Sequence, residues 1–267
     1  MLNRLIRLGG RLAESHPYSW KLAWESVHRF KFLLPHDKSY CALRHFIAAK
    51  PGGLFLDIGA NDGISALSLR RFAADYRILS LEPNRLLEPA LQKIKTEDPL
   101  FDYRMIGAGA TAAKISFFVP SYRGIVLHTF VSADREQVAR AIGQCFGPRI
   151  ARNTAIVSVE GEVVPIDTLG VAPTIIKIDA EGFDYQVLLG AAETIARLRP
   201  FIMVEVAWAD QNRIIEFFSE RKYTVLTYDA NLDRFQPATV SVPVMTSGQR
   251  NCFAVPTEHL KSCPVRS

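Results

Sequence analysis

The sequence predicts an α/β fold built on a doubly wound, mostly parallel β-sheet. From residue 53 onward, short apolar segments alternate with amphipathic segments, which is typical of parallel strands joined by helices. Glycine and acidic residues follow several of the apolar segments, at the positions where strands would end. A length of 267 residues, 48% of them hydrophobic, suffices for one large domain with a substantial core.

Each expected strand is a short apolar run, and each expected helix carries apolar residues at helical spacing. We expect strands at residues 54–58, 77–81, 101–106, 174–178, 201–206, 223–227 and 252–255. We expect helices at residues 63–72, 85–95 and 210–221, and a further helix that begins near residue 183. Right-handed crossovers would join the parallel strands.

Residues 115–167 interrupt this alternation. They combine two extended stretches, 115–119 and 156–166, with a helix at 132–146, and Glu160-Gly161-Glu162 indicates a turn in the second stretch. We predict that they form an insertion, or cap, within a main domain of residues 51–267. Such an insertion would lie over the carboxyl ends of the strands, where folds of this kind bind their ligands.

Residues 1–50 differ from the rest of the chain in charge. They hold nine of the 32 Lys and Arg residues but three of the 27 Asp and Glu residues, so the remainder is nearly neutral. We expect a basic helical segment here, with Asp37 as the N-cap of a helix that contains Leu43 and Phe46. A nearly neutral main domain argues against a nucleic-acid groove.

The beginning of the chain allows two interpretations. Residues 1–15 interleave apolar side chains with Arg4, Arg7 and Arg11, a pattern that could bind an anionic membrane or a partner protein. Packing against the main domain is the equal alternative, because Gly9-Gly10 weakens an isolated helix.

The sequence also predicts a cellular compartment. No apolar run approaches the ~18–20 residues of a membrane-spanning helix, and the N-terminus lacks the pattern of a secretory signal. The four cysteines show no metal-binding spacing and are expected to be free thiols: Cys41, Cys145, Cys252 and Cys263. We expect a cytoplasmic protein, with peripheral membrane contact through residues 1–15 as an open alternative.

A glycine-containing loop, Asp57-Ile58-Gly59-Ala60-Asn61-Asp62-Gly63, follows the first expected strand. Gly59 lets the backbone turn and approach a ligand closely. The loop lacks the middle glycine of a dinucleotide fingerprint, and Asp62 would repel a pyrophosphate. An acidic loop suits S-adenosylmethionine, which carries an ammonium and a sulfonium group but no phosphate. We expect Asp57, Gly59, Asn61 and Asp62 to contact this cofactor, with Asp57 holding its amino group directly or through water.

Two further stretches fit the same cofactor. Glu82, in Leu81-Glu82-Pro83-Asn84 after the second expected strand, can accept hydrogen bonds from both ribose hydroxyls, as acidic residues do in dinucleotide folds. Small residues follow the third strand, where they would let an adenine ring lie against the backbone. The remaining predicted cofactor contacts are therefore Glu82, Pro83, Asn84, Gly107 and Ala108.

Several stretches of the sequence resemble the FkbM family of S-adenosylmethionine-dependent O-methyltransferases. They are residues 55–63, 81–84, 165–169, 176–182 continuing to Gly190-Ala191, and 200–205. The most specific is Lys177-Ile178-Asp179-Ala180-Glu181-Gly182. Asp62 stands where many members have an apolar residue, although others carry the same Asn-Asp-Gly.

This resemblance implies a class I, Rossmann-like methyltransferase fold with a seven-stranded sheet and an antiparallel final strand near residues 252–255. It also implies methyl transfer to a hydroxyl group, commonly on a sugar, a glycan or a specialised metabolite. The match spans roughly residues 53–206 and omits the first 50 residues, while the insertion varies among such proteins. The identity of the acceptor is therefore not implied.

Acidic residues gather where the strands of the second half end. Asp179 ends one strand, Glu181 follows it, and Glu205 ends the next strand. Methyl transfer to an alcohol needs a base that takes the hydroxyl proton. We expect Asp179 or Glu181 to be this base and Asp179 also to contact the cofactor, although Glu181 could instead cap the next helix. Lys177, on the buried strand, is expected to pair with a carboxylate.

Three alternatives stay open for this chemistry. His128, in the insertion, is an alternative base. A divalent metal ion could neutralise the crowded carboxylates, but we favour a metal-free site because no Asp-Asn pair follows Glu205. The chain could also be a nucleic-acid or protein methyltransferase that grips its polymer through the basic N-terminus, or a non-catalytic module that binds S-adenosylmethionine. Against amino-group methylation, the sequence lacks an Asn/Asp-Pro-Pro-Tyr/Phe motif.

Overall fold

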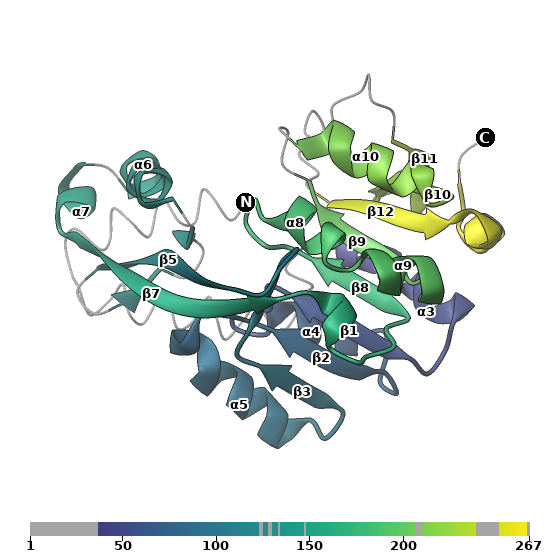
Figure 1. Ribbon diagram of the computed structural model, residues 1–267, viewed down its shortest axis with the longest axis horizontal. Coiled ribbons are helices and arrows are strands. Elements are labelled where there is room, and N and C mark those ends of the chain that lie inside the picture. The colour runs from purple at the N-terminus through teal and green to yellow at the C-terminus, as the bar shows by residue number, and fades with distance from the viewer. Residues whose placement is uncertain are drawn as a thin grey trace. The chain divides into compact units, whose positions relative to one another are not determined.

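The computed structural model describes residues 37–122, 125–127, 130–132, 134–146, 148–206, 210–238 and 251–265 (Figure 1). The expectations for residues 1–36 and for His128 lie outside these residues. The chain divides into two compact units. The larger unit comprises residues 35–113 and 162–267, and the smaller unit includes residues 114–161. No described helix is long and apolar enough to cross a membrane.

An eight-stranded sheet forms the centre of the larger unit, in the order β11-β10-β12-β9-β8-β1-β2-β3. The five neighbouring strands β3, β2, β1, β8 and β9 run parallel to one another. β12 lies between β9 and β10 and runs antiparallel to both. The bounds are β1 (Leu54–Ile58), β2 (Arg77–Leu81), β3 (Phe101–Arg104), β8 (Ile175–Ile178), β9 (Phe201–Glu205), β10 (Tyr223–Asp229), β11 (Arg234–Pro237) and β12 (Asn251–Pro256). The predicted doubly wound sheet with an antiparallel final strand is confirmed.

The eighth strand corrects the expected count of seven. β11 pairs antiparallel with β10 across a tight turn, in which Asp229 Oδ1 accepts hydrogen bonds from the N–H groups of Asn231 and Leu232. The strand has four residues and ends at Pro237 on the edge of the sheet, where proline is tolerated. Such a short edge strand carries no apolar run that a sequence could show.

Helices cover both faces of this sheet (Figure 1). One core packs the strands against η2 (Lys38–Ala42), α3 (Leu43–Ala49), α4 (Ile64–Arg70) and α5 (Glu88–Glu97). The other core packs them against α8 (Asp184–Leu189), α9 (Ala192–Leu198) and α10 (Gln211–Glu220). Successive side chains of a strand point to opposite faces, so Phe55 belongs to the first core and Leu56 to the second.

Short 3-10 helices complete the larger unit: η3 (Arg85–Leu87), η5 (Ile166–Thr168) and η8 (Thr257–Ser262). Asp37 caps η2, as predicted, because its carboxylate accepts a hydrogen bond from the N–H of Ser39 at 2.8 Å. The same Asp37 accepts a hydrogen bond from the amide of Asn251 at 2.9 Å, so η2 is tied to the first residue of β12.

The register of the central strands aligns their carboxyl ends. Ile58 at the end of β1 lies opposite Leu81 in β2 and Ile178 in β8. One residue earlier, Asp57 lies between Ser80 and Lys177. These three polar side chains share one face because they occupy the same position in the pleat.

A second sheet has the order β4-β7-β5-β6 and corrects one prediction. Its strands are β4 (Gly107–Ala108), β5 (Ala113–Tyr122), β6 (Ile125–Val126) and β7 (Thr154–Val164). The predicted turn at residues 160–162 is wrong, because β7 continues through it as one strand. A hairpin turn needs positive φ, which Gly161 does not have.

The smaller unit has its own core. α6 (Arg135–Phe146) and α7 (Pro148–Arg152) contribute Val138, Ile142 and Ile150, which pack with Tyr122 of β5. The predicted helix at residues 132–146 is confirmed with a later start, since Ser132 lies before the helix and its hydroxyl oxygen accepts a hydrogen bond from the N–H of Asp134.

All four cysteines are free thiols, as predicted. Burial raises the pKa of Cys252 to about 12 and that of Cys263 to about 11. Both thiols are therefore protonated and chemically inert at neutral pH.

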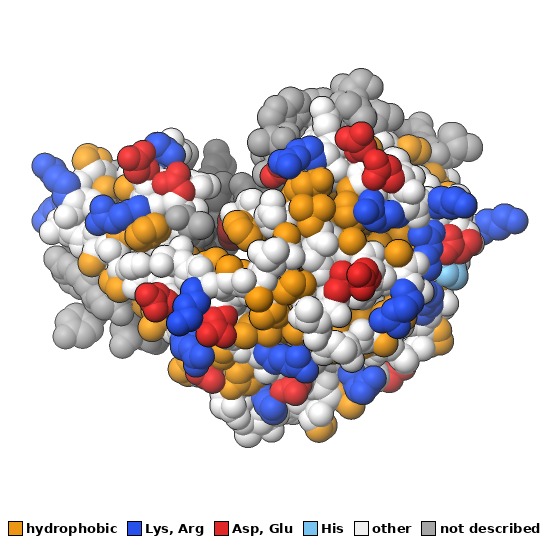
Figure 2. Space-filling model, in the orientation of Figure 1, with side chains coloured by type: hydrophobic (Ala, Val, Ile, Leu, Met, Phe, Trp, Pro, Cys, Tyr) orange, Lys and Arg blue, Asp and Glu red, His pale blue; other side chains and the backbone are white. Residues whose placement is uncertain are grey.

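Charges of both signs are mixed on the described surface. Figure 2 shows acidic and basic side chains interspersed among apolar ones on the face that it draws, without a large region of a single sign. The face drawn therefore lacks a continuous positive groove of the kind with which proteins hold nucleic acid.

Candidate cofactor and active site

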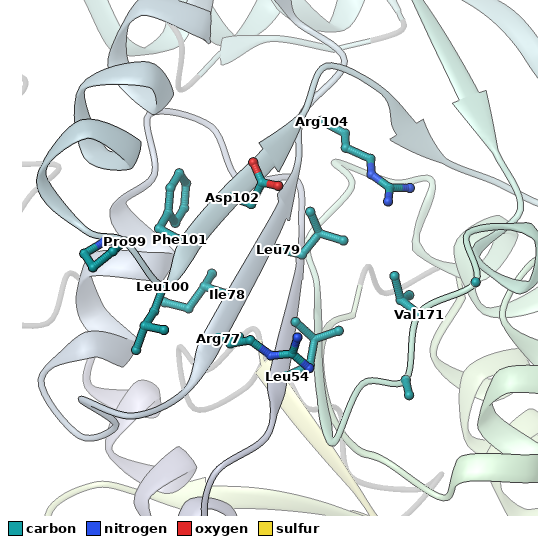
Figure 3. Close-up of a pocket in the computed structure, with 12 residues that line it drawn as sticks. Leu54, Arg77, Ile78, Leu79, Pro99, Leu100, Phe101, Asp102, Arg104 and Val171 are labelled. Carbon is teal, nitrogen blue, oxygen red and sulfur yellow. The ribbon is translucent and has the colours of Figure 1, made fainter.

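A cavity of 480 Å³ runs along β1, β2 and β3 (Figure 3). Its lining includes the first residue of each of these strands, Leu54, Arg77 and Phe101, and the loop at residues 170–172. None of the residues that the sequence predicts for cofactor binding or catalysis lines it. The cavity is therefore separate from the site at the carboxyl ends of the strands.

The loop after β1 crosses the ends of two neighbouring strands. The N–H groups of Gly59 and Ala60 donate hydrogen bonds to the carbonyl oxygen of Leu81, at 3.0 and 3.1 Å. A Cβ on Gly59 would stand 1.8 Å from the carbonyl oxygen of Asp179 at the end of β8. Gly59 also has a φ of 73°, in the left-handed region that favours glycine. Only glycine fits at this position, so the loop can pass between the two strands.

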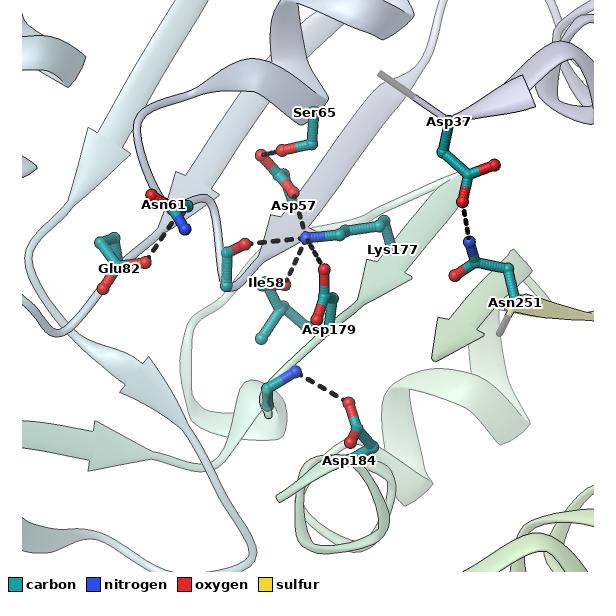
Figure 4. Close-up of polar contacts among 12 residues, drawn as sticks. Asp37, Asp57, Ile58, Asn61, Ser65, Glu82, Lys177, Asp179, Asp184 and Asn251 are labelled. Atoms are coloured by element: carbon teal, nitrogen blue, oxygen red, sulfur yellow. Dashed lines mark hydrogen bonds and ion pairs between the residues drawn. The ribbon is translucent and has the colours of Figure 1, made fainter. Parts of the chain in front are cut away.

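Asp57 is the most buried carboxylate of the site, with no exposed surface. Its Oδ2 accepts a hydrogen bond from the hydroxyl group of Ser65 at 2.6 Å (Figure 4) and another from the hydroxyl group of Ser80 at 2.9 Å. Its Oδ1 lies 3.4 Å from Lys177 Nζ, an ion-pair distance, and accepts no hydrogen bond from the described residues. Asp57 thus keeps one buried oxygen with acceptor capacity at the end of β1.

Lys177 joins the ends of β1 and β8. Its ammonium group donates hydrogen bonds to the carbonyl oxygens of Ile58 at 3.2 Å and Gly59 at 2.8 Å. Asp179 Oδ2 lies 3.4 Å from the same nitrogen (Figure 4). Burial lowers the pKa of Lys177, but the charges of Asp179 and Asp57 raise it, and the net pKa lies above its usual value. The predicted pairing of Lys177 with a carboxylate is confirmed, and this lysine is charged at neutral pH.

Glu82, at the end of β2, binds the backbone on both of its oxygens. Oε2 accepts a hydrogen bond from the N–H of Asn61 and Oε1 from the N–H of Asn84, each at 2.9 Å. Asn61 has a φ of 52°, which turns its N–H toward Glu82. Burial raises the pKa of Glu82 to about 7, although the two backbone hydrogen bonds lower it. Each oxygen retains a lone pair for a further donor.

Asn84 presents an unpaired amide group beside Glu82. Its Oδ1 accepts a hydrogen bond from the N–H of Leu86 at 3.1 Å and caps η3. Its Nδ2 is buried and has no hydrogen-bond partner among the described residues. A buried donor without a partner is costly, so a ligand that accepts a hydrogen bond from Nδ2 would be stabilised there.

The loop after β8 holds a strained turn. Glu181 and Gly182 both have positive φ, 49° and 91°, and this conformation is unfavourable for glutamate. The carboxylate of Asp184 accepts hydrogen bonds from the N–H groups of Ala180 at 2.8 Å and Gly182 at 3.1 Å. Asp184 therefore holds this loop, and burial raises its pKa. Glu181 is exposed, and the N-cap residue of α8 is Phe183, which makes no side-chain hydrogen bond.

The predicted small residues meet the end of β2. Gly107 lies against Pro83, since a Cβ on Gly107 would stand 3.3 Å from Pro83 Cγ. Ala108 is 4% exposed and belongs to the core on the α8–α10 face. Gly107 can thus contribute backbone to a ligand beside Pro83, whereas the side chain of Ala108 is covered.

Most of the predicted site residues come together. The Asp57–Lys177–Asp179 cluster lies at the ends of β1 and β8, and its Lys177 and Asp57 interact electrostatically with Glu82. Asp62 is half-buried in the loop after β1. Glu205 ends β9, opposite Asn251 of β12. His128 lies outside the described residues, so its role as a base stays a prediction.

Several residues that shape this site have only weak signals in the sequence. Ser65 and Ser80 hold Asp57, and a serine on a buried strand such as β2 is the only sign of that role. Asp184 is visible as an acidic residue in the first turn of α8. Tyr40 of η2 is buried. Burial and the charges of Asp57 and Asp179 raise the pKa of its hydroxyl group, although the charge of Lys177 lowers it.

A family model described as the Methyltransferase FkbM domain matches residues 57–225, more than half of the chain. The chain belongs to this family. The matched region contains both ends of the site, from Asp57 to the Lys177–Gly182 stretch, so the resemblance seen in those motifs is confirmed. This FkbM-family protein has a class I, Rossmann-like methyltransferase fold.

Several solved methyltransferases are similar in structure. FkbM methyltransferase from Methylobacillus flagellatus KT has 17% identity and a TM-score of 0.45, over 76% of this chain and 43% of that one. Precorrin-6y C5,15-methyltransferase from Geobacter metallireducens GS-15 has 10% identity and a TM-score of 0.40, over 80% of this chain and 84% of that one. A methyltransferase from Geobacter sulfurreducens has 10% identity and a TM-score of 0.39, over 87% of this chain and 86% of that one. The chain thus spans less than half of the length of the first. No curated protein matches the chain.

The family and the fold imply S-adenosylmethionine as methyl donor, and the residues at the strand ends fit it. Asp57 Oδ1 offers a buried acceptor for an ammonium group. Glu82 has acceptor capacity left on both oxygens, and Asn84 Nδ2 is a buried donor without a partner. Among the described residues, no group of three or more His, Cys, Asp or Glu side chains is placed to hold a metal ion.

Proposed function

We propose that this FkbM-family protein is an S-adenosylmethionine-dependent O-methyltransferase that acts on a hydroxyl group of a sugar, a glycan or a specialised metabolite. The observation that carries the proposal is the Asp57–Lys177–Asp179 cluster beside Glu82 (Figure 4). It combines acceptors for a cationic cofactor with a partly exposed carboxylate, since the side chain of Asp179 is 35% exposed. The transfer to oxygen rests on the family resemblance of the motifs.

The cofactor would lie along the ends of β1 and β2. Asp57 would accept a hydrogen bond from its amino group, directly or through water, and Glu82 would accept hydrogen bonds from its ribose hydroxyls. Ribose hydroxyls donate best to an ionised carboxylate. Because the pKa of Glu82 is raised to about 7, cofactor binding should release a proton from this residue below that pH. Asn84 and Gly107 would flank the adenine.

Bound S-adenosylmethionine supplies a methyl group on a positively charged sulfur. The chain must align the acceptor oxygen with that methyl group and remove the hydroxyl proton. Asp179 and Glu181 are the candidate bases, because both lie on the strained loop after β8. As the acceptor oxygen forms its bond to the methyl carbon and the bond from that carbon to sulfur breaks, the carboxylate would take up the hydroxyl proton.

This mechanism does not require a metal ion. The ammonium group of Lys177 lies 3.4 Å from both Asp57 and Asp179 and already neutralises part of their charge. A divalent cation bound between these carboxylates would be repelled by the lysine. We expect activity to withstand EDTA. Activity that disappears with EDTA and returns with Mg²⁺ would contradict the metal-free mechanism.

The direct test is methyl transfer from labelled S-adenosylmethionine to glycan and metabolite pools, followed by mass spectrometry. We expect a gain of one labelled methyl group on an oxygen atom of a small acceptor. Incorporation into RNA, DNA or protein would instead identify a polymer methyltransferase. Binding of S-adenosylhomocysteine without transfer to any pool would favour a non-catalytic module.

The cofactor site can be tested without knowing the acceptor. Glu82→Ala should weaken S-adenosylhomocysteine binding by about 1–3 kcal/mol, the range for lost hydrogen bonds to a charged group. Isothermal titration calorimetry measures this loss, and circular dichroism checks that the variant is folded. Wild-type affinity in a folded Glu82→Ala protein would remove Glu82 from the ribose site.

A further inference from the structure

Lys177 contacts both β1 and the loops that follow β1 and β8 at the cofactor end of these strands. The pairing of the two strands places Lys177 directly opposite Asp57. Its Nζ lies 3.4 Å from one oxygen each of Asp57 and Asp179 and donates hydrogen bonds to the carbonyl oxygens of Ile58 and Gly59. The side chain is 4% exposed. A buried ammonium group with these partners is a fixed part of the site.

We propose that Lys177 is a positioning residue of the cofactor site. Its ammonium group fixes the glycine loop against the end of β8 and reduces the charge of the Asp57–Asp179 pair to a single negative charge toward the cofactor. This inference rests on the proposed use of S-adenosylmethionine, and it adds to that proposal a role for a residue that does not itself touch the reacting atoms.

The glycine loop is held from two sides. In the peptide group that joins Gly59 to Ala60, the carbonyl oxygen accepts a hydrogen bond from Lys177 Nζ at 2.8 Å. The N–H of the same peptide group donates to the carbonyl oxygen of Leu81 at 3.1 Å. One peptide plane is therefore clamped between β8 and β2, and Lys177 supplies one of the two clamps. Without it, the partly buried carbonyl oxygen of Gly59 would lose this hydrogen bond.

The charges around Lys177 come from four elements. Asp57 faces it from β1 and Asp179 from β8, while Tyr40 of η2 and Glu82 after β2 interact with it electrostatically. Asp57 has no exposed surface, so an unpaired negative charge there would be costly. With Lys177 charged, both carboxylates can stay ionised. Without it, the two would share a proton, because like charges at short distance disfavour joint ionisation.

The net charge matters for the ligand. S-adenosylmethionine carries two positive groups and one carboxylate, so a single negative charge on the protein matches its net positive charge. A doubly negative pair would first bind a proton and then have to release it when the cofactor arrives. Lys177 thus removes a proton from the binding equilibrium, which makes affinity less dependent on pH.

The test compares Lys177→Met, which removes the charge, with Lys177→Arg, which keeps it. We expect Lys177→Met to lower the melting temperature by on the order of 10 °C, because it leaves a buried charge unpaired. Lys177→Arg should recover part of this loss. Asp57→Asn in the Lys177→Met background should also recover part of it, because the double variant no longer contains the unpaired buried carboxylate.

The second readout is the pH profile of S-adenosylmethionine binding without an acceptor, measured by calorimetry between about pH 6 and about pH 9. Lys177→Met should bind at least about 10-fold more weakly at pH 6 and improve as pH rises, as the shared proton leaves. This added step should be absent from Lys177→Arg and from the double variant. Lys50→Met is the matched control, because Lys50 donates a hydrogen bond to the carbonyl oxygen of Arg199, outside this site. The cofactor affinity of the Lys50→Met variant should equal that of the wild type.

Equal destabilisation by Lys177→Met and Lys177→Arg, with no recovery from Asp57→Asn, would overturn the proposal and leave Lys177 as a packing residue. An unchanged pH profile in Lys177→Met would overturn it as well. If Lys177→Met does not fold, a folded double variant supports the charge role, and an unfolded one contradicts it. Failure of the wild type to bind S-adenosylmethionine would count against the proposed function, and the unfolding series would still decide the role of Lys177.

Discussion

Glu82 couples its own protonation to the stability of the folded chain. Burial raises the pKa of Glu82 to about 7, although hydrogen bonds from the backbone N–H groups of Asn84 and Asn61 lower it. A glutamate in an unfolded chain titrates near about 4.3. The folded chain therefore binds this proton more tightly than the unfolded chain does. The resulting stabilisation, on the order of 3 kcal/mol, is fully present below the unfolded pKa and is lost as pH rises to about 7.

Glu82→Gln should remove this pH dependence. The free energy of unfolding of the wild type should fall relative to that of the variant between about pH 4.5 and about pH 8. This range spans the pKa of Glu82 in the unfolded chain, about 4.3, and its pKa in the folded chain, about 7. Urea unfolding at several pH values measures the difference. Glu97→Gln, on the exposed side of α5, is the control and should follow the wild type. Parallel curves for wild type and Glu82→Gln would show that Glu82 does not titrate in this range.

Asp179 combines partial exposure with a position beside the cofactor loop, as a base for the acceptor requires. Asp179→Asn should retain S-adenosylhomocysteine binding and lose about 10²–10⁴-fold in turnover, the usual effect of removing a general base. Glu181→Gln tests the other candidate on the same loop. Single-turnover assays with the identified acceptor measure both. Near-normal turnover in the Asp179→Asn, Glu181→Gln double variant would exclude both residues from the chemistry.

The glycine loop is the element whose backbone decides the site. Gly59→Ala must place a Cβ 1.8 Å from the carbonyl oxygen of Asp179 and must also keep a φ of 73°. Gly170→Ala is the matched control, because Gly170 has a φ of +67° but no atom within 4 Å of the added Cβ. The control should cost about 1–2 kcal/mol of unfolding free energy, from the left-handed conformation alone.

Gly59→Ala should cost clearly more, on the order of 4 kcal/mol, because backbone must move to relieve the clash. It should also abolish S-adenosylhomocysteine binding, whereas Gly170→Ala should bind like the wild type. Urea unfolding and calorimetry give the two numbers. Equal costs for the two variants would mean that the loop after β1 moves freely away from β8.

The elements that the sequence predicts well are those whose burial produces an unmistakable apolar run. β1 and β2 have the predicted bounds, because strands covered on both faces are continuously apolar. β11 was missed because a four-residue edge strand is not buried on both faces. The turn predicted at Gly161 fails for a related reason: glycine permits a turn but does not require one, and the pairing of the neighbouring strands keeps β7 extended.

The site follows the same rule. Asp57, Glu82 and Asp179 could be predicted, because parallel strands bring residues at their carboxyl ends to one edge of a sheet. The hydrogen bonds of Asp184 to the loop after β8, and those of Ser65 and Ser80 to Asp57, depend on strand register and loop path. Those are properties of the folded chain, which spacing along the sequence does not contain.

At the scale of the whole molecule, charge is divided unevenly along the chain. Residues 1–50 carry nine basic and three acidic residues, while the remainder carries nearly equal numbers of each. The face drawn in Figure 2 agrees with the near-neutral charge of the remainder, since acidic and basic side chains are mixed on it. The N-terminal segment concentrates the positive charge of the chain, so it is the part of the sequence best suited to attract an anionic surface.

We propose that residues 1–15 bring the protein to anionic membranes. Their apolar side chains would enter the interface while Arg4, Arg7 and Arg11 contact lipid phosphates, each worth about 1 kcal/mol near a charged surface. Flotation with vesicles that contain phosphatidylserine should recover the full chain at low salt and lose it at high salt, because salt screens this attraction. Deletion of residues 1–15 should abolish flotation.

Substitution of Arg4, Arg7 and Arg11 by glutamine should weaken flotation by about 10²-fold, the equivalent of roughly 3 kcal/mol. The same change at three exposed basic residues elsewhere, Lys114, Arg135 and Arg149, alters net charge equally and should leave flotation intact. Equal losses in the two triple variants would mean that net charge, and not the N-terminal segment, drives binding. Flotation that survives both the deletion and high salt would contradict a membrane role for residues 1–15 and favour their packing against the rest of the chain.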